Sequence, residues 1–271
     1  MGKLLNISIV LYKTPQEEWE TLVRELLRAK SVNAVYLVDN SPEPIEGYTW
    51  GQRVHYMHSD RNVGYGAAHN VAIRETIYDE VSFHLVINSD IQVSAQAIDN
   101  LIDVMLVNSA VGQLMPNVVN SKGEIQYLCK LLPTPIDLLR RIVLGKRGKD
   151  SKRNARFELR DLDHSRPINV PYLSGCFMLL RTEALLKAGL FDERFFMYPE
   201  DIDLTRRIHR DYLTLYYPSE TVVHAHRQAS YHNVKMLWIH ATNMARYFCK
   251  WGWLFDSERR LFNRLVLNPS H

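Results

Sequence analysis

Apolar residues in the first half of the chain alternate between short unbroken runs and runs with a helical period. The unbroken runs predict buried strands and lie at Ile7–Tyr12, Val35–Asn40, around Arg53–Ser59 and at Phe83–Asp90. Between them, Glu17–Ala29 repeats apolar residues every three or four positions, and Ala67–Ile77 also predicts a helix. Strands interleaved with helices predict an α/β fold, with a mostly parallel sheet covered on both faces.

The second half has longer polar stretches between its apolar runs. Val170–Arg181 predicts one buried strand, and Tyr216–Ser230 contains another, followed by His224 and His226. The last 41 residues mix aromatic and basic side chains at helical spacing. We therefore divide the chain into a main domain, residues 1–230, and a helical extension, residues 231–271. Within the main domain we expect two halves, residues 1–110 and residues 111–230.

Composition excludes several classes of protein. The 271 residues are 46% hydrophobic, which is enough for a full core. Three widely spaced cysteines predict neither a disulfide framework nor a zinc site. We find no signal-peptide pattern and no apolar run long enough to span a bilayer, so we expect a cytoplasmic protein. A net charge of +3 is too small to indicate nucleic acid, although the basic cluster Leu138–Arg160 suits anionic lipid or phosphate.

Two predicted strands end in aspartate. Asp39, before Asn40, and Asp90, after Ser89, each follow an apolar run, and open α/β sheets bind ligands beyond the carboxyl ends of their strands. The Asp-Asn-Ser-Pro sequence at Asp39 is equally compatible with an ordinary turn. A carboxylate at a strand end suits a hard divalent cation, but one carboxylate alone is a weak indication of a metal site.

A glycine-containing segment, Asp60–Asn70, lies between these strand ends. Gly64 and Gly66 precede a predicted helix, where glycine lets the backbone approach a ligand closely and leaves N–H groups available for phosphate. The segment lacks the residues of a P-loop and of the dinucleotide fingerprint. On its own it is also compatible with a turn.

Three acids follow an aromatic run in FFMYPEDIDLTRRI, residues Phe195–Ile208. Pro199 and first-turn acids are typical of a helix start, and this interpretation accounts for Glu200 or Asp203. It leaves unexplained why aromatic residues lead into the adjacent carboxylates Glu200 and Asp201, since ionised groups beside apolar walls are costly unless used.

The order of these motifs carries a family resemblance. The succession VDNSP, RNVGYGAAHN, LVINSD, YLSGCFMLLR and FDERFFMYPEDIDL resembles the inverting glycosyltransferases of family 2, which have the GT-A fold. It is most similar to the bacterial rhamnosyltransferases that build O-antigen, lipopolysaccharide and other cell-envelope polysaccharides. The resemblance covers roughly Ile7 to Ser230. It implies that residues 1–110 are the nucleotide-sugar half and residues 111–230 the acceptor and catalytic half.

The resemblance implies a nucleotide-sugar site. Residues near the nucleoside and diphosphate would be Asp39, Asn40, Asn62, Gly64, Tyr65, Gly66, Asn70, Ser89 and Asp90. The metal-binding Asp-x-Asp of the family appears here as Asn88-Ser89-Asp90, so the first acid is missing. Asp90 would hold Mg²⁺ or Mn²⁺, with His224 as a further metal or diphosphate contact and His226 as the fallback.

The resemblance also implies the catalytic residues. Ser174 and Gly175 would form the floor of the acceptor site, with Tyr198 and Glu200 against the acceptor. Asp201 would be the general base that deprotonates the acceptor hydroxyl. Glu200 would position the acceptor or raise the pKa of Asp201, because adjacent carboxylates separate their pKa values.

The family suggests partners but leaves alternatives. The preferred donor is dTDP-L-rhamnose, with UDP-linked hexose or galactofuranose as alternatives, and the acceptor is a polysaccharide or a polyprenyl-diphosphate-linked sugar. The C-terminal residues suit a peripheral position on the inner membrane, core packing or a homodimer interface. A non-catalytic nucleotide-sugar-binding protein would not need Asp201. A nucleotidyltransferase would place glycine after the first strand, where ISIVLYKTPQEEW has none.

Overall fold

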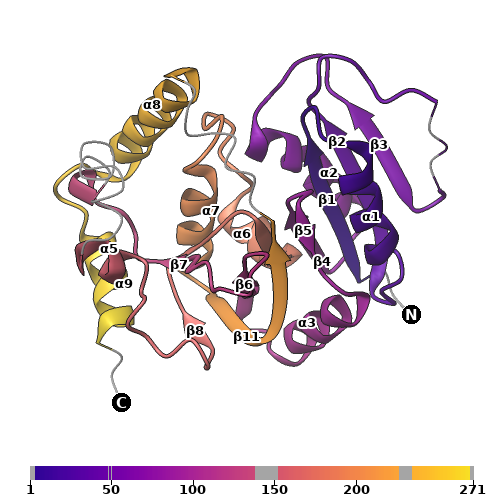
Figure 1. Ribbon diagram of the computed structural model, residues 1–271. Helices are drawn as coiled ribbons and strands as arrows, with labels where there is room; N and C mark the ends of the chain where they lie inside the picture. The colour runs from indigo at the N-terminus through magenta and orange to yellow at the C-terminus, as the bar shows by residue number, and fades with distance from the viewer. Residues whose placement is uncertain (1–3, 48, 50, 138–151, 226–233, 269–271) are drawn as a thin grey trace.

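The predicted alternation of strands and helices is confirmed in the first half of the molecule (Figure 1). A computed structural model describes residues 4–47, 49, 51–137, 152–225 and 234–268. The elements of the first half are β1 (Leu5–Leu11), α1 (Gln16–Leu26), β2 (Val32–Asp39), β3 (Val54–His58), α2 (Tyr65–Tyr78), β4 (Phe83–Ile87), β5 (Ile91–Gln92) and α3 (Ala95–Val107). Trp19, Leu22, Val23 and Leu26 form the buried stripe of α1, as its sequence period requires.

The second half completes the same sheet. Its described elements are β6 (Val111–Val119), β7 (Cys129–Lys130), α5 (Lys152–Phe157), β8 (Ile168–Asn169), β9 (Tyr172–Leu173), β10 (Phe177–Arg181), α6 (Thr182–Ala188), α7 (Glu200–Ile208), β11 (Leu213–His224), α8 (Val234–Trp251) and α9 (Ser257–Leu267). The strand order is β3-β2-β1-β4-β10-β6-β11-β5, with β8 beside β11. Six of these nine strands, β1, β2, β3, β4, β6 and β11, run in one direction, so the sheet is mostly parallel.

The prediction of a single strand over Val170–Arg181 is wrong in one respect. It is divided into β9, which pairs with β7 in a small separate sheet, and β10, which lies in the central sheet. The break falls at Ser174–Cys176, where the backbone N–H of Gly175 donates to Asp201 Oδ2 at 2.8 Å instead of to a strand. The interruption turns this backbone toward the start of α7.

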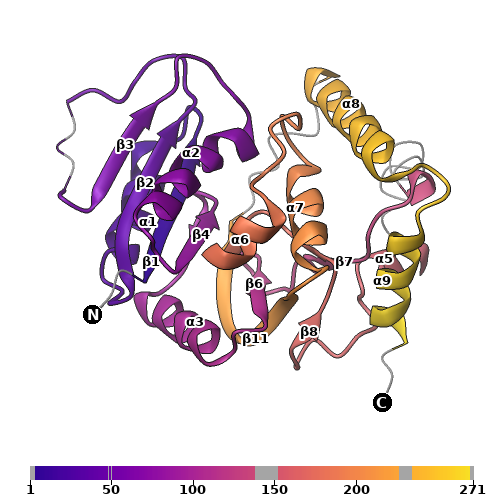
Figure 2. The ribbon, with the colours of Figure 1, turned by 180° about the vertical axis from the view of Figure 1, so that it is seen from behind.

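The C-terminal helices belong to the main core. Met244, Tyr247 and Phe248 of α8 and Val266 of α9 lie in the same buried cluster as the central strands. Arg206 of α7 is fully buried, and its guanidinium binds both carboxylate oxygens of Asp256 at 2.6 and 2.8 Å. Figures 1 and 2 show α8 and α9 beyond α7, on the side of the molecule opposite β1–β3. Among the described helices, none combines the length and apolar character needed to cross a bilayer.

Candidate active site

Asp39 closes β2 beside a small pocket. Its Oδ2 accepts a hydrogen bond from the Tyr56 hydroxyl at 2.8 Å, and its Oδ1 accepts one from the Ser41 backbone at 2.9 Å. Asp39, Ser41, Lys13 and Thr14 help to line a pocket of about 380 Å³. A carboxylate fixed by two donors at the edge of such a pocket is suited to accept hydrogen bonds from the N–H groups of a bound base.

The glycine segment is held against the loop that precedes α7. Gly64 has φ +92°, and a Cβ at this position would lie 2.3 Å from the carbonyl oxygen of Phe196. The same oxygen accepts a hydrogen bond from Tyr65 N at 2.9 Å. Asn62 Oδ1 accepts from Gly64 N, and Asn40 Nδ2 donates to Gly64 O. Gly64 is therefore required by backbone conformation and by space.

Two other residues of this segment act as connectors. The Tyr65 hydroxyl lies 2.9 Å from Asn88 Oδ1 and 2.8 Å from Gly175 O. It therefore joins the start of α2 to the end of β4 and to the turn between β9 and β10. Asn70 is buried, and its amide bonds Phe191 N, Phe191 O and Glu193 Oε1. Asn70 thus holds the 191–193 loop. Gly66 packs against Phe191, because a Cβ there would meet Phe191 Cβ at 2.9 Å.

Asp90 and His224, 134 positions apart in the sequence, meet at the sheet edge. Asp90 Oδ1 lies 3.2 Å from His224 Nε2. Gln126 Nε2 donates a hydrogen bond to His224 O at 2.8 Å. This bond turns the Oε1 atom of Gln126 toward His224 Nδ1, at 3.1 Å. With Nδ1 protonated, Nε2 presents a lone pair toward the carboxylate. His226 lies outside the described residues.

This donor set fits a divalent cation. An imidazole lone pair and a carboxylate oxygen facing each other repel unless a cation lies between them or the imidazole is protonated, and a fixed Nδ1–H is the usual support for a metal-binding histidine. No group of three or more potential ligands occurs in the part of the chain that the structure describes. Asp90 and His224 would therefore supply two ligands, leaving the others to the diphosphate and water.

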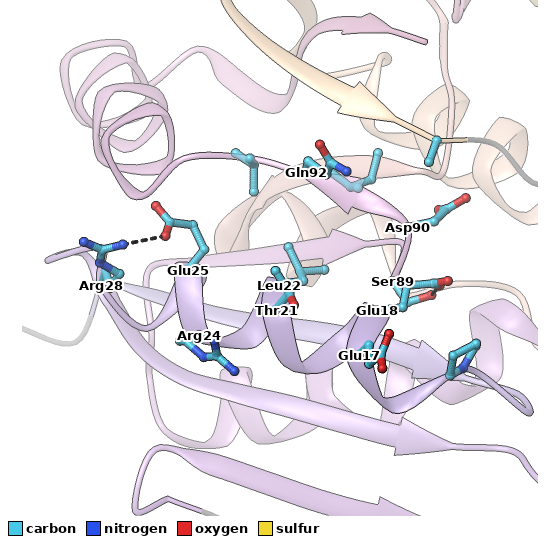
Figure 3. Close-up of a pocket in the computed structure, with 14 residues that line it drawn as sticks. Glu17, Glu18, Thr21, Leu22, Arg24, Glu25, Arg28, Ser89, Asp90 and Gln92 are labelled. Atoms are coloured by element: carbon cyan, nitrogen blue, oxygen red, sulfur yellow. Dashed lines mark hydrogen bonds and ion pairs between the residues drawn. The ribbon is translucent and has the colours of Figure 1, made fainter. Parts of the chain in front are cut away.

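A pocket of about 750 Å³ adjoins Asp90 along α1 (Figure 3). Ser89 and Asp90 line one end together with Glu17 and Glu18, and the Ser89 hydroxyl donates to Glu18 Oε1 at 2.7 Å. Arg24, Glu25 and Arg28 line the other end. Neither Asp39 nor the Glu200–Asp201 pair belongs to its lining, so this pocket reaches the site at Ser89 and Asp90, away from the two buried acids.

Glu200 and Asp201 begin α7 and are both buried. Asp201 accepts hydrogen bonds from Gly175 N at 2.8 Å and from Ile202 N at 2.7 Å, one on each carboxylate oxygen. Gly175 leaves room for this contact, since a Cβ there would stand 3.2 Å from Asp201 Cβ. Glu200 Oε2 is buried and has no hydrogen-bond partner among the described residues.

Burial separates the protonation behaviour of the two acids. It raises the pKa of Asp201 to about 6, against the lowering effect of the Gly175 and Ile202 N–H groups and of Lys130. Burial also raises the pKa of Glu200 well above its usual range, and the charge of Asp201 adds to this. Of the two acids, Glu200 therefore holds a proton more strongly than Asp201. Asp201 is therefore suited to accept a proton and Glu200 to donate a hydrogen bond.

Asp203 has a different task from its neighbours. Its Oδ1 accepts from Trp251 Nε1 at 2.8 Å and from Lys250 Nζ at 2.6 Å, and its Oδ2 accepts from Arg207 Nε at 2.9 Å. The third acid of the motif therefore joins α7 to α8. Tyr198, before Pro199, has φ +92°, an uncommon backbone conformation for a bulky residue, and its ring packs edge-on against His240 of α8. Ser174 is half-buried at the turn after β9.

Sequence analysis missed several residues that support this site. Tyr56 holds Asp39, Glu18 holds Ser89, Gln126 orients His224, and Lys130 places a positive charge near Asp201. Tyr56 follows from strand register, because β3 runs parallel beside β2. Gln126 and Lys130 lie in or beside short irregular segments, where no periodic pattern indicates which side chains face the site.

Comparison with known proteins identifies the family of this chain. Residues 36–189, more than half of the chain, match the model of Glycosyl transferase family 2. An N-acetylglucosaminyl-diphospho-decaprenol L-rhamnosyltransferase of Mycobacterium tuberculosis is 30% identical over 241 residues, which cover 83% of this chain and 76% of that protein.

Solved structures show the same fold at low sequence identity. GalNAc-T7 with UDP, GalNAc and Mn²⁺ matches with a TM-score of 0.60 and 14% identity, over 83% of this chain but only 44% of that one. S. aureus TarS 1–349 matches with a TM-score of 0.58 and 15% identity, over 98% of this chain and 71% of that one. The predicted GT-A architecture is confirmed. This protein is a glycosyltransferase that belongs to family 2 and resembles the bacterial rhamnosyltransferases.

Proposed function

We propose that the protein transfers L-rhamnose from dTDP-rhamnose to a sugar linked to a polyprenyl diphosphate, with inversion at the anomeric carbon. The observation that carries the proposal is the backbone-anchored Asp201 beside Glu200, the acid of the pair that holds a proton more strongly. The choice of sugar and acceptor is supported by the mycobacterial relative, whose name specifies rhamnosyl transfer and a diphospho-decaprenol-linked N-acetylglucosamine.

In this mechanism Asp201 takes the proton of the attacking hydroxyl. The acceptor oxygen attacks the anomeric carbon from the face opposite the nucleoside diphosphate, the new glycosidic bond forms, and the bond to the diphosphate breaks. The proton moves to a carboxylate oxygen of Asp201, whose two backbone donors fix its direction. Glu200 donates a hydrogen bond to the acceptor, with Ser174, Gly175 and Tyr198 around it.

The donor lies across the ends of β2, β4 and β11. Asp39 and Asn40 receive the base, while Asn62 and Gly64–Gly66 follow the nucleoside and diphosphate, with Asn70 supporting them from behind. Asp90 and His224 would hold Mg²⁺ or Mn²⁺, which would neutralise negative charge on the diphosphate. Ser89 orients this strand end through Glu18.

The deciding experiment compares Asp201→Asn with the unmodified protein. The reaction is run with dTDP-rhamnose and a synthetic lipid-linked N-acetylglucosamine, donor affinity is measured separately, and NMR determines the anomeric configuration of the product. We expect an inverted product and a 10²–10⁴-fold slower chemical step in Asp201→Asn, about the contribution of a positioned base. An unchanged rate or a retained configuration would contradict the mechanism.

The donor is tested in the same assay. UDP-glucose, UDP-galactose and UDP-galactofuranose replace dTDP-rhamnose at equal concentration, with and without a chelator. Turnover with one of these and not with dTDP-rhamnose would leave the transferase mechanism intact but overturn the choice of rhamnose. Full turnover in chelator would overturn the metal assignment.

A further inference from the structure

The turn between α8 and α9 exposes three consecutive large apolar side chains. Trp253, Leu254 and Phe255 are 47, 71 and 86% exposed. On α9, one helical turn apart, Leu261 and Leu265 are each about half exposed. A group of large apolar residues left in water on one surface indicates an interaction site, because isolated exposures are common but clusters are not. In both views the turn lies at the outer edge of the molecule, away from β1–β3 (Figures 1 and 2).

Among the described residues 249–268, the charged side chains that are fully exposed are all positive. Arg260 and Arg264 are exposed beside the apolar residues. The two acids of this segment turn inward instead. Asp256 is buried against Arg206, and Glu258 is bound by Arg206 and Arg210. From residue 249 to residue 268, every exposed side chain is apolar, uncharged or cationic.

The turn is held in one conformation. Gly252 has φ +101°, and a Cβ there would stand 2.6 Å from the carbonyl oxygen of Phe255. Asp256 accepts from Arg259 N and begins α9, and the Trp253 ring packs 5.3 Å from that of Phe248. The apolar side chains are thus presented by an ordered structure and need no rearrangement to make contact.

We propose that this surface, the turn Gly252–Phe255 with the exposed face of α9, docks the protein onto an anionic lipid bilayer. The apolar side chains enter the headgroup boundary, and Arg260 and Arg264 meet lipid phosphates. A second copy of the chain fits less well, because a two-fold contact through this patch would bring arginines of the same charge together without acids. The inference rests on the proposed lipid-linked acceptor, whose membrane anchor makes such docking useful.

Sedimentation of the full-length protein with vesicles tests the proposal. One set contains equal phosphatidylcholine and phosphatidylglycerol, and the other contains phosphatidylcholine alone. We expect the protein to bind to the anionic vesicles only. In Arg260→Gln/Arg264→Gln, the affinity for these vesicles should fall about fivefold for each arginine removed. In Leu254→Ser/Phe255→Ser, the affinity for anionic vesicles should fall at least about tenfold. The control Leu106→Ser/Val107→Ser changes apolar residues at the end of α3 that are 51 and 86% exposed, and it is expected to bind as the unmodified protein does.

Two further measurements separate the alternatives. Equal binding by all variants, or no binding to anionic vesicles, overturns the proposal. So does a dimer in analytical ultracentrifugation that Leu254→Ser/Phe255→Ser converts to a monomer. Transfer to a water-soluble acceptor is measured in parallel and is expected to be unchanged in these variants. Vesicle binding needs neither donor nor acceptor, so the docking surface and the proposed reaction can fail independently.

Discussion

Glu200 and Asp201 show how position within one helix turn gives neighbouring carboxylates different chemistry. Both are buried, but Asp201 has a backbone donor on each oxygen, and Glu200 Oε2 has no partner among the described residues. Sequence analysis assigned Glu200 either to the acceptor or to raising the pKa of Asp201. Burial is the main cause of the raised pKa of Asp201, which favours the acceptor role for Glu200.

This difference predicts the pH profile. We expect kcat/KM to rise with pH through about 6, as Asp201 loses its proton. Glu200→Gln keeps a neutral hydrogen-bond donor, so the pH at which kcat/KM rises should change little. Glu200→Ala removes the donor and should raise the KM for the acceptor. The measurement is initial rate against pH at saturating donor. A limb displaced by a full pH unit in Glu200→Gln would show that Glu200 is ionised and acts on Asp201 by charge.

Gly64 combines two constraints that can be measured separately. Gly64→Ala adds a side chain at positive φ and places it against Phe196 O, whereas Gly123→Ala adds one at φ +81° with open space around it. We expect Gly123→Ala to lose about 1 kcal/mol in urea unfolding and Gly64→Ala to lose at least twice as much, with weaker donor binding. Equal losses would mean that the Phe196 contact relaxes at little cost.

At the scale of elements, the end of β11 depends on a residue outside the sheet. Gln126 fixes the imidazole of His224 toward Asp90. We expect Gln126→Ala to weaken activation by Mn²⁺ by about 10- to 100-fold, because a residue that orients a metal-binding histidine acts through that histidine. The affinity for the donor measured without Mn²⁺ should be unchanged. Titrating Mn²⁺ in the transfer assay measures this. Asn117→Ala, which removes a bond to Thr221 on the same strand, is the control.

The contact of α7 with α9 is a buried ion pair. Arg206 and Asp256 are 1 and 2% exposed, and Arg206 also lies over the Trp251 ring. Arg206→Leu removes the guanidinium that binds both oxygens of Asp256 and leaves only the more distant Arg259, at 3.8 Å, to balance this buried charge. We therefore expect a loss of about 3–5 kcal/mol in the free energy of unfolding. Arg24→Leu, which breaks a largely exposed pair with Glu20, should change little. Similar urea midpoints for the two variants would contradict this assignment.

The sequence predicted regular elements better than supporting contacts. The strands ending at Asp39 and near Asp90 follow from apolar runs, because buried parallel strands need continuous apolar sequence. The meeting of Asp90 with His224 was suggested by the family resemblance alone, since β5 and β11 become neighbours only through the sheet order. The break at Ser174–Cys176 was not predicted, because its cause is the carboxylate of Asp201, 26 residues further along the chain.

At the scale of the whole molecule, buried neutral histidines govern stability in mild acid. Burial lowers the pKa of His84 to about 3 and of His209 to about 4, and it also lowers that of His69. His69 and His84 both bond Ser8 Oγ, at 2.6 and 2.8 Å. Because the unfolded chain binds these protons near pH 6.5 and the folded chain does not, stability falls as the pH falls below 6.5.

We therefore expect the free energy of unfolding to decrease from pH 7.5 to 5.5. The loss is about 1.4 kcal/mol for each of His84 and His209 at one unit below 6.5, and His69 adds to it. Asp201 and Glu200 partly offset this loss, because their raised pKa values make the folded chain bind protons more readily than the unfolded chain. Urea unfolding at the two values measures it. A His84→Gln protein that keeps the fold should lose less on acidification than the unmodified protein. Higher stability at pH 5.5 would mean that the buried carboxylates dominate.

The loop between Phe191 and Pro199 bonds the glycine segment, Asp60–Asn70, on one side and α8 on the other. Phe196 O accepts from Tyr65 N, and Met197 O accepts from Asn243 Nδ2. In a genetic screen for loss of the glycan product, damaging substitutions should therefore be recovered at Asn243, Arg206 and Asp256 as well as at Asp201. Mutations at many positions that contact neither sugar could then inactivate the transferase.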